Sequence, residues 1–239
     1  MDRFGKALGL AVVSVALGGV AQATPLSIGD VVQVGNRSGS EFTPTPIAGD
    51  ANGLYTSVSF LLDGTRSNSA YAGLFVLDYS ANGTSWTEFL SFCLEPDVYL
   101  TPFSNPYTVS SLGSSEYSSD LIGELWGRYR NNVVSDVSAA AFQVALWELA
   151  YGETDLNLST GAFRLTSGGA VAALASSWLS SLDGMGPQAS GLAVLANNQR
   201  LADRQDLLTQ VSVPEPATLA LFGLGLLGIG ASRRRKQAQ

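Results

Sequence analysis

Short apolar segments with a period of two dominate the chain between residues 31 and 94. In the clearest of them Val58, Phe60 and Leu62 fall on one face and alternate with polar or small neighbours, which is typical of a half-buried strand. Asp-Gly at 63–64 and Asn-Gly at 82–83 are turn signals between such segments. The pattern predicts antiparallel strands over Val31–Val34, Leu54–Leu62, Ala72–Tyr79 and Ser85–Leu94.

The middle of the chain changes to a helical period. Apolar residues recur every three to four positions, and the strongest of these segments follows a candidate N-cap at Ser135 or Asp136 and stops at Gly152. After Pro102, Asn105 and Pro106, which indicate irregular chain, we expect helices over Asp120–Arg130, Val137–Tyr151 and Ala170–Leu182 and strands over Gly191–Leu195 and Gln205–Val213. The order predicts one α+β domain, with an antiparallel β-rich N-terminal half, central helices and two C-terminal strands.

The N-terminus has the pattern of an export signal. Arg3 and Lys6 precede an uncharged apolar run over 7–20, and Ala21-Gln22-Ala23 has the small-x-small pattern of a cleavage site. Residues 1–23 therefore predict a signal peptide that is removed. The alternative is an uncleaved membrane anchor, for which the apolar run is short.

The C-terminus combines three features in order. Pro214, Glu215 and Pro216 are followed by the apolar run 217–232 and then by four cations at 233–236. The run is at the short limit of a transmembrane segment, and the cations favour a cytoplasmic tail with the domain outside.

Residues 214–239 resemble the PEP-CTERM sorting signal of exported proteins from many Gram-negative bacteria. The resemblance implies recognition by an exosortase and transient anchoring in the inner membrane. It also implies removal of the tail and a final location on the cell surface or in the extracellular matrix. The alternative is a plain tail anchor. Either way, residues 24–213 form the predicted extracellular domain.

Composition excludes several chemistries. The chain has no histidine and one cysteine, so it has no Ser-His-Asp triad, no histidine metal site and no internal disulfide. No calcium-loop spacing is present, and we expect neither a metal nor a cofactor. The whole chain has a net charge of −7, and region 24–213, with seven basic and eighteen acidic residues, is near −11. This acidity argues against a nucleic-acid partner.

One polar residue lies on an apolar helix face. On a helical wheel Ala139, Gln143, Leu146 and Ala150 form one stripe, with Glu148 opposite. Burying the Gln143 amide costs a few kcal/mol unless its polar atoms find partners. One explanation is a structural glutamine bonded to nearby backbone.

The lone cysteine offers a second explanation. Cys93 is unpaired in a protein bound for an oxidising compartment, where a free thiol is a liability unless it is buried or chemically bonded. It could be a small buried hydrophobe. It could also attack the Gln143 carboxamide and expel ammonia, which leaves an internal thioester in a shielded pocket. An external amine or hydroxyl could later take the acyl group, once per molecule.

Both residues lie in motifs that resemble those of bacterial surface thioester domains. Phe92-Cys93-Leu94-Glu95 is similar to their cysteine motif, and Phe142-Gln143-Val144-Ala145-Leu146-Trp147-Glu148 is similar to their glutamine motif. The resemblance implies a Cys93–Gln143 crosslink and covalent adhesion to a surface or matrix nucleophile, with no turnover as an enzyme. We expect Phe92, Phe142 and Trp147 to shield the bond. The 50-residue separation is short for that family, whose best-known members are Gram-positive adhesins.

Two other functions stay open. A non-covalent structural or carbohydrate-binding component of the extracellular polysaccharide matrix would need no reactive bond, and Trp126 or Trp178 could face a sugar, although tryptophans on helices are more often core. A hydrolase would need paired carboxylates, for which Glu88, Glu95 and Asp97 are the nearest group. Glu88 and Glu95 fall in opposite strand phases, so solvated charges are the simpler interpretation of this group.

Overall fold

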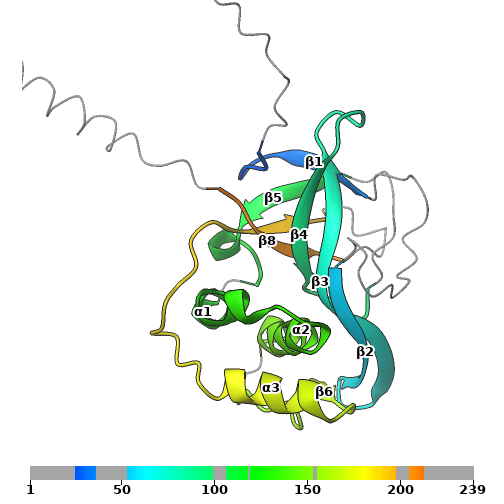
Figure 1. Ribbon diagram of the computed structural model, residues 1–239, viewed down its shortest axis with the longest axis vertical. Coiled ribbons are helices and arrows are strands. Elements are labelled where there is room, and N and C mark those ends of the chain that lie inside the picture. The colour runs from blue at the N-terminus through cyan, green and yellow to red at the C-terminus, as the bar shows by residue number, and fades with distance from the viewer. Residues whose placement is uncertain are drawn as a thin grey trace, which may run out of the picture.

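The computed structural model describes residues 25–35, 53–98, 106–117, 119–152, 155–197 and 205–212 (Figure 1). Strands come first, three α-helices follow with one short strand between the second and the third, and the chain returns to strands. The elements are β1 (Val31–Gly35), β2 (Gly53–Leu62), β3 (Arg66–Ser80), β4 (Thr87–Cys93), β5 (Tyr107–Ser111), α1 (Asp120–Tyr129), α2 (Asp136–Ala150), β6 (Phe163–Leu165), α3 (Ala170–Leu179), β7 (Leu192–Ala196) and β8 (Leu207–Gln210), with 3₁₀ turns at Leu112–Ser114 and Arg130–Asn132.

The strands form one sheet that closes on itself in part. Its order is β1-β5-β7-β8-β4-β3-β2-β6, and β1 pairs a second time with β3. That pairing closes β1, β5, β7, β8, β4 and β3 into a ring, here called the barrel. Strands β2 and β6 extend beyond the barrel. All pairings are antiparallel. The predicted α+β fold is confirmed.

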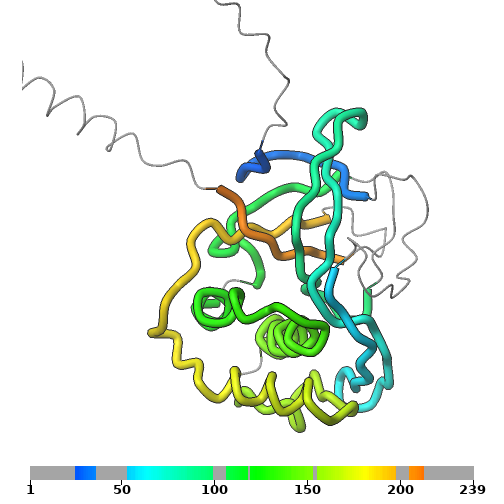
Figure 2. Tube along the Cα trace, viewed as in Figure 1, coloured from blue at the N-terminus to red at the C-terminus, as the bar shows by residue number. Residues whose placement is uncertain are grey.

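The β2–β3 hairpin links the barrel to the helices. Its two strands pair along the whole of β2, and the chain reverses at Asp63 and Gly64, both with positive φ. Gly64 adopts this conformation without steric cost, as the predicted Asp-Gly turn requires. Figure 2 shows the hairpin curving away from the barrel to run alongside the helices. Val58, Phe60 and Leu62 are buried as the alternation predicted.

Helix α2 is the central element of the helical layer. It begins at a capping box in which the Ser135 and Ser138 side chains each bond to the other's backbone N–H. Every residue from Ser138 to Leu149 is buried, because α1, α3 and the strands surround the helix (Figure 1). The wheel had set Glu148 opposite the apolar stripe, but Glu148 is buried too. A helix enclosed on all sides has no solvent face.

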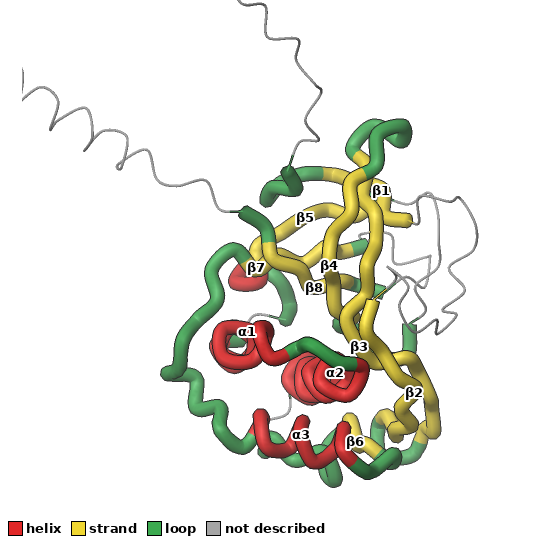
Figure 3. The backbone as a smooth tube through the Cα atoms, in the orientation of Figure 1, coloured by secondary structure: helices red, strands yellow, loops and turns green. Residues whose placement is uncertain are grey.

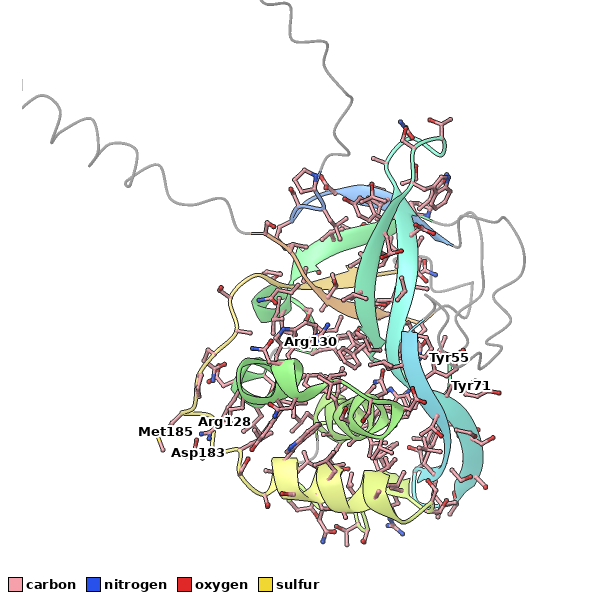
Figure 4. All side chains as sticks on the ribbon, viewed as in Figure 1. Tyr55, Tyr71, Arg128, Arg130, Asp183 and Met185 are labelled. Atoms are coloured by element: carbon pink, nitrogen blue, oxygen red, sulfur yellow. The ribbon has the colours of Figure 1, made fainter. Side chains whose placement is uncertain are left out.

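A loop between α3 and β7 is fastened along α1 (Figure 3). The buried carboxylate of Glu124 accepts the backbone N–H groups of Asp183 and Gly184, at 3.1 and 2.6 Å, and pairs with Arg128 at 2.6 Å. Figure 4 shows Arg128 and Asp183 on this side of α1. Gly127 lets the loop approach closely, since a Cβ there would collide with the Pro187 carbonyl oxygen.

The structure adds two strands that the pattern did not predict. β5 follows directly after the proline-rich stretch, and β6 has only three residues. The third helix ends at Leu179, earlier than predicted, and β8 is shorter than predicted, Leu207–Gln210. The predicted signal peptide (1–23) and the tail from 214, with its apolar run 217–232, lie outside the described residues. Among the described helices, none has the length and hydropathy to span a membrane.

Candidate functional site

Cys93 and Gln143 lie side by side. The backbone N–H of Cys93 donates to Gln143 Oε1 at 2.9 Å, and Gln143 Nε2 donates to the Cys93 carbonyl oxygen at 2.6 Å. The last residue of β4 is thereby joined to the middle of α2, across 50 positions of sequence. The structure brings together the two residues that the sequence singled out.

The path of the strands explains why a glutamine fits there. β3 pairs with β4 only as far as Phe75 opposite Ser91. On the other edge, the N–H of Leu94, just after β4, donates to the carbonyl oxygen of Asp206, just before β8. Main-chain groups of successive strand residues point to opposite edges. Those of Cys93 therefore point to the edge that β3 has left, and the Gln143 carboxamide bonds to both.

The pair lies in the protein interior. Gln143 has no exposed surface and Cys93 is 3% exposed. Burial raises the pKa of the Cys93 thiol far above its usual range, and the negative charge of Glu95 raises the pKa further. The thiol is therefore protonated at neutral pH, and water has little access to the carboxamide.

The three predicted shielding residues have different surroundings. Phe92 and Phe142 pack against each other with ring centroids 4.5 Å apart, and Trp126 lies edge-on to both. Trp147 is buried against Phe60 and Phe163 of the β2–β6 side. Successive strand side chains point to opposite faces. The Phe92 ring therefore covers the helix-facing side of β4, and the Cys93 thiol points to the other face.

Arg130 adds a cation to the aromatic group, which the sequence did not suggest. Its guanidinium lies 5.9 Å from the Phe92 ring centroid and 5.8 Å from that of Trp126. Half-burial lowers the pKa of the Arg130 guanidinium. Figure 4 shows Arg130 between α1 and the strands. Trp126 and Trp178 are core residues, so neither presents a sugar-binding face.

The thiol side of β4 carries two more polar groups. Ser91 precedes Cys93 by two positions and therefore shares its face. Its Oγ is buried and has no hydrogen-bond partner among the described residues. Glu95 follows Cys93 by two positions, where the strand has ended. The buried Ser91 Oγ thus shares the thiol's face, and a simple hydrophobic role for Cys93 would not require it.

Glu95 is half-buried, contrary to the solvated charge that the sequence suggested. Its Oε2 accepts the N–H of Asp206 at 2.8 Å, and its carbonyl oxygen accepts from the Gln205 side chain. Burial raises the pKa of Glu95 to about 7, opposed by the Asp206 N–H and reinforced by the charges of Asp206, Asp97 and Glu116. Glu88 is exposed on the same strand.

A second carboxyl group adjoins Glu95. Asp206 accepts the Asn197 N–H at 2.9 Å and the Tyr117 hydroxyl at 3.4 Å, and burial raises the pKa of its carboxyl. Burial and the neighbouring carboxylates also raise the pKa of Tyr117. No group of three or more acidic or cysteine side chains within the described ranges is arranged to hold a metal ion.

The site has two chemical interpretations. The two hydrogen bonds give both the N–H and the carbonyl oxygen of Cys93 a partner. The amide can therefore have a purely structural role, in which it takes the place of a neighbouring strand. The same two bonds hold the amide carbonyl carbon beside the thiol-bearing residue, with Oε1 on a backbone donor. Such a donor stabilises the oxyanion that forms when a nucleophile adds to the carbonyl.

Comparison with known proteins identifies the C-terminal signal. The PEP-CTERM protein-sorting motif matches residues 212–236. No curated protein and no solved structure matches the chain. These findings give no support to the resemblance to thioester domains, which stays a prediction.

The motif defines the class of this protein. It is an exported protein that an exosortase sorts, and it is anchored transiently in the membrane before processing. The matched segment begins at residue 212, directly after Val211, which is buried and bonded to the Gly191 carbonyl oxygen. The sorting signal therefore follows the folded domain without an intervening linker.

Proposed function

We propose that this protein is a cell-surface or matrix protein that attaches covalently to its partner through a thioester between Cys93 and Gln143. It acts once per molecule and not as an enzyme. The observation that carries the proposal is the paired hydrogen bonding of the Gln143 carboxamide to the main chain of the only cysteine, in a buried setting.

The chemistry needs no outside reagent. The Cys93 side chain first rotates from the far face of β4 toward the open strand edge. Its sulfur then adds to the Gln143 amide carbon, and Oε1 takes the negative charge while the Cys93 N–H donates to it. The C–N bond then breaks, ammonia leaves with the thiol proton, and the thioester remains. A partner amine or hydroxyl later forms an amide or ester with the glutamyl carbonyl and releases the thiol. Burial protects the bond from hydrolysis in the meantime.

A second candidate is a non-covalent component of the extracellular matrix. It is favoured by the fact that the same hydrogen bonds already account for a buried glutamine, because β3 leaves the Cys93 main chain without a strand partner on that edge. In that case Gln143 is structural and the thiol stays free in the core.

Intact mass separates the two candidates. A full chain that carries the thioester is lighter by one ammonia than its composition requires, and methylamine adds one molecule to it. Cys93→Ser leaves both backbone hydrogen bonds possible, so it is the matched control and shows neither effect. A wild-type chain with its full mass, inert to methylamine and with a thiol that is alkylated after unfolding, contradicts the thioester and favours the structural role.

A further inference from the structure

The Cys93 thiol needs a base, because its own acidity is too weak to supply a thiolate. Its raised pKa keeps it protonated at neutral pH, and bulk water does not reach it readily. The chain has no histidine, and histidine is the most common general base in proteins. Any proton transfer at this thiol therefore depends on another side chain close to Cys93.

Glu95 is the titratable side chain nearest to Cys93 along the chain. Two residues of chain span at most about 7 Å, so its backbone lies close to that of Cys93. The Glu95 charge is felt at the thiol, since it contributes to the raised thiol pKa. Its carboxyl is held in place by the Asp206 N–H, which donates to Oε2 at 2.8 Å. Oε1 accepts no hydrogen bond from the described residues and can take up a proton.

The groups around Glu95 are mostly acidic. The charges of Asp206 just before β8, Asp97 in the same loop and Glu116 before α1 all raise its pKa. Tyr117 reaches Asp206 from the segment before α1. Among the described residues no cation contributes to the pKa of Glu95, and Arg66 pairs instead with Asp97 at 2.9 Å. Glu95 thus takes up a proton more readily than an ordinary glutamate.

We propose that Glu95 is the proton carrier of the Cys93–Gln143 site, a role that rests on the proposed thioester. In formation, the Sγ–H proton passes to the Glu95 carboxylate as the S–C bond forms. It then passes to Gln143 Nε2 as the C–N bond breaks, and ammonia leaves. In transfer to a partner, Glu95 takes the proton from the attacking amine or hydroxyl and returns it to the departing sulfur. No electron is gained or lost overall.

The test is the pH dependence of thioester opening in the full chain. Hydroxylamine is the probe, because it is uncharged over most of the range from about pH 5.5 to about pH 8.5, and intact mass follows its addition. The wild-type rate is expected to rise with pH with a midpoint near 7, where Glu95 loses its proton. Glu95→Gln keeps an acceptor for the Asp206 N–H but carries no proton, so its rate is expected to fall by about 10²-fold or more and to lose the midpoint.

Two further variants distinguish proton transfer from a structural effect. Asp206→Asn keeps the backbone N–H on Glu95 but removes a negative neighbour, so the midpoint is expected to move to lower pH. Glu88→Gln, an exposed charge on the same strand, is expected to leave rate and midpoint unchanged.

The outcomes test the inference separately from the proposed function. A wild-type chain without the mass loss contradicts the thioester itself. A Glu95→Gln chain that carries the thioester and opens at the wild-type rate, or more slowly with the wild-type midpoint, overturns the role of Glu95 alone. A folded Glu95→Gln chain that retains its ammonia supports the role in formation.

Discussion

A thioester between Cys93 and Gln143 would be a covalent crosslink, and its removal has a calculable effect on stability. The two residues are 50 positions apart. By the chain-entropy relation used for disulfides, closing a loop of this length removes enough disorder from the unfolded chain to stabilise the fold by about 4 kcal/mol. Cys93→Ser prevents the crosslink but keeps the Gln143 amide, whose Nε2 leaves as ammonia in the thioester and can again donate to the Cys93 carbonyl oxygen. This regained hydrogen bond offsets about 1–3 kcal/mol, so the net cost is expected to be about 1–3 kcal/mol.

The hydrogen bonds contribute separately and can be measured in the same background. Gln143→Met has a similar volume but leaves the Cys93 N–H and carbonyl buried without partners. Each orphaned group costs about 1–3 kcal/mol, so the substitution is expected to cost about 2–6 kcal/mol when it is added to Cys93→Ser. In the crosslinked wild type the same substitution also removes the thioester, so its cost there should be larger by the net cost of losing the crosslink, about 1–3 kcal/mol.

Urea titration followed by tryptophan fluorescence measures these free energies of unfolding, and a double-mutant cycle compares them. Opening the wild type with methylamine should reproduce most of the loss seen in Cys93→Ser. The reasoning is refuted if Cys93→Ser costs under about 1 kcal/mol and Gln143→Met costs the same in both backgrounds. That result would mean that the hydrogen bonds alone account for the stabilising effect of Gln143.

Three other predictions concern the charges and close contacts around the site. Because the pKa of Glu95 is raised when folded, the folded state binds the extra proton, so stability is expected to fall as pH rises from about 4.5 toward 7; Glu95→Gln should flatten that part of the urea-midpoint profile. Glu124→Ala removes the buried acceptor of two backbone N–H groups and the partner of Arg128, and should lower the free energy of unfolding by about 3–5 kcal/mol. Gly127→Ala inserts a methyl against the Pro187 carbonyl and should cost about 1–3 kcal/mol in the same titration.

Each of these predictions has an outcome that would contradict it. A pH profile that is unchanged in Glu95→Gln would mean that another group governs it. Glu124→Gln keeps an acceptor, so it should recover part of the loss, and equal losses in the two variants would point to packing instead. Gly113→Ala is the control for Gly127→Ala, since a Cβ at Gly113 meets nothing within 4 Å. Equal costs at the two glycines would show that the close approach of the loop does not matter.

Local patterns were sufficient for most of the elements. The alternation in β2 identified its buried face, and the cap at Ser135 and the stop at Gly152 bracketed α2 within a residue or two. These features depend on neighbours in sequence, where hydrophobic periodicity and capping act. The burial of Glu148 depends instead on how many elements surround α2, which the helix's own period does not reveal.

Long-range pairing could not be read from the pattern. β5 has five residues and β6 has three, and each is a strand because of what it pairs with. The β1–β3 contact that closes the barrel joins residues more than forty positions apart and has no local signal. The half-burial of Glu95 arises in the same way, because β8 returns beside the end of β4 and brings Asp206 to it.

The meeting of Cys93 and Gln143 lies between these two cases. The sequence pointed to both residues because their chemistry is unusual for their positions. A glutamine on an apolar stripe and a lone exported cysteine each needed an explanation. Their contact, however, follows from the way β4 separates from β3 after Ser91, which pairs with Phe75. A main chain left open at that edge would accept any buried amide, and an asparagine or a backbone group could have filled it. That the amide belongs to Gln143 and the open edge to Cys93, with the polar groups of Ser91 and Glu95 beside the thiol, is more than backbone satisfaction requires. These additional features are the physical reason to test for a thioester before a purely structural role is assigned to Gln143.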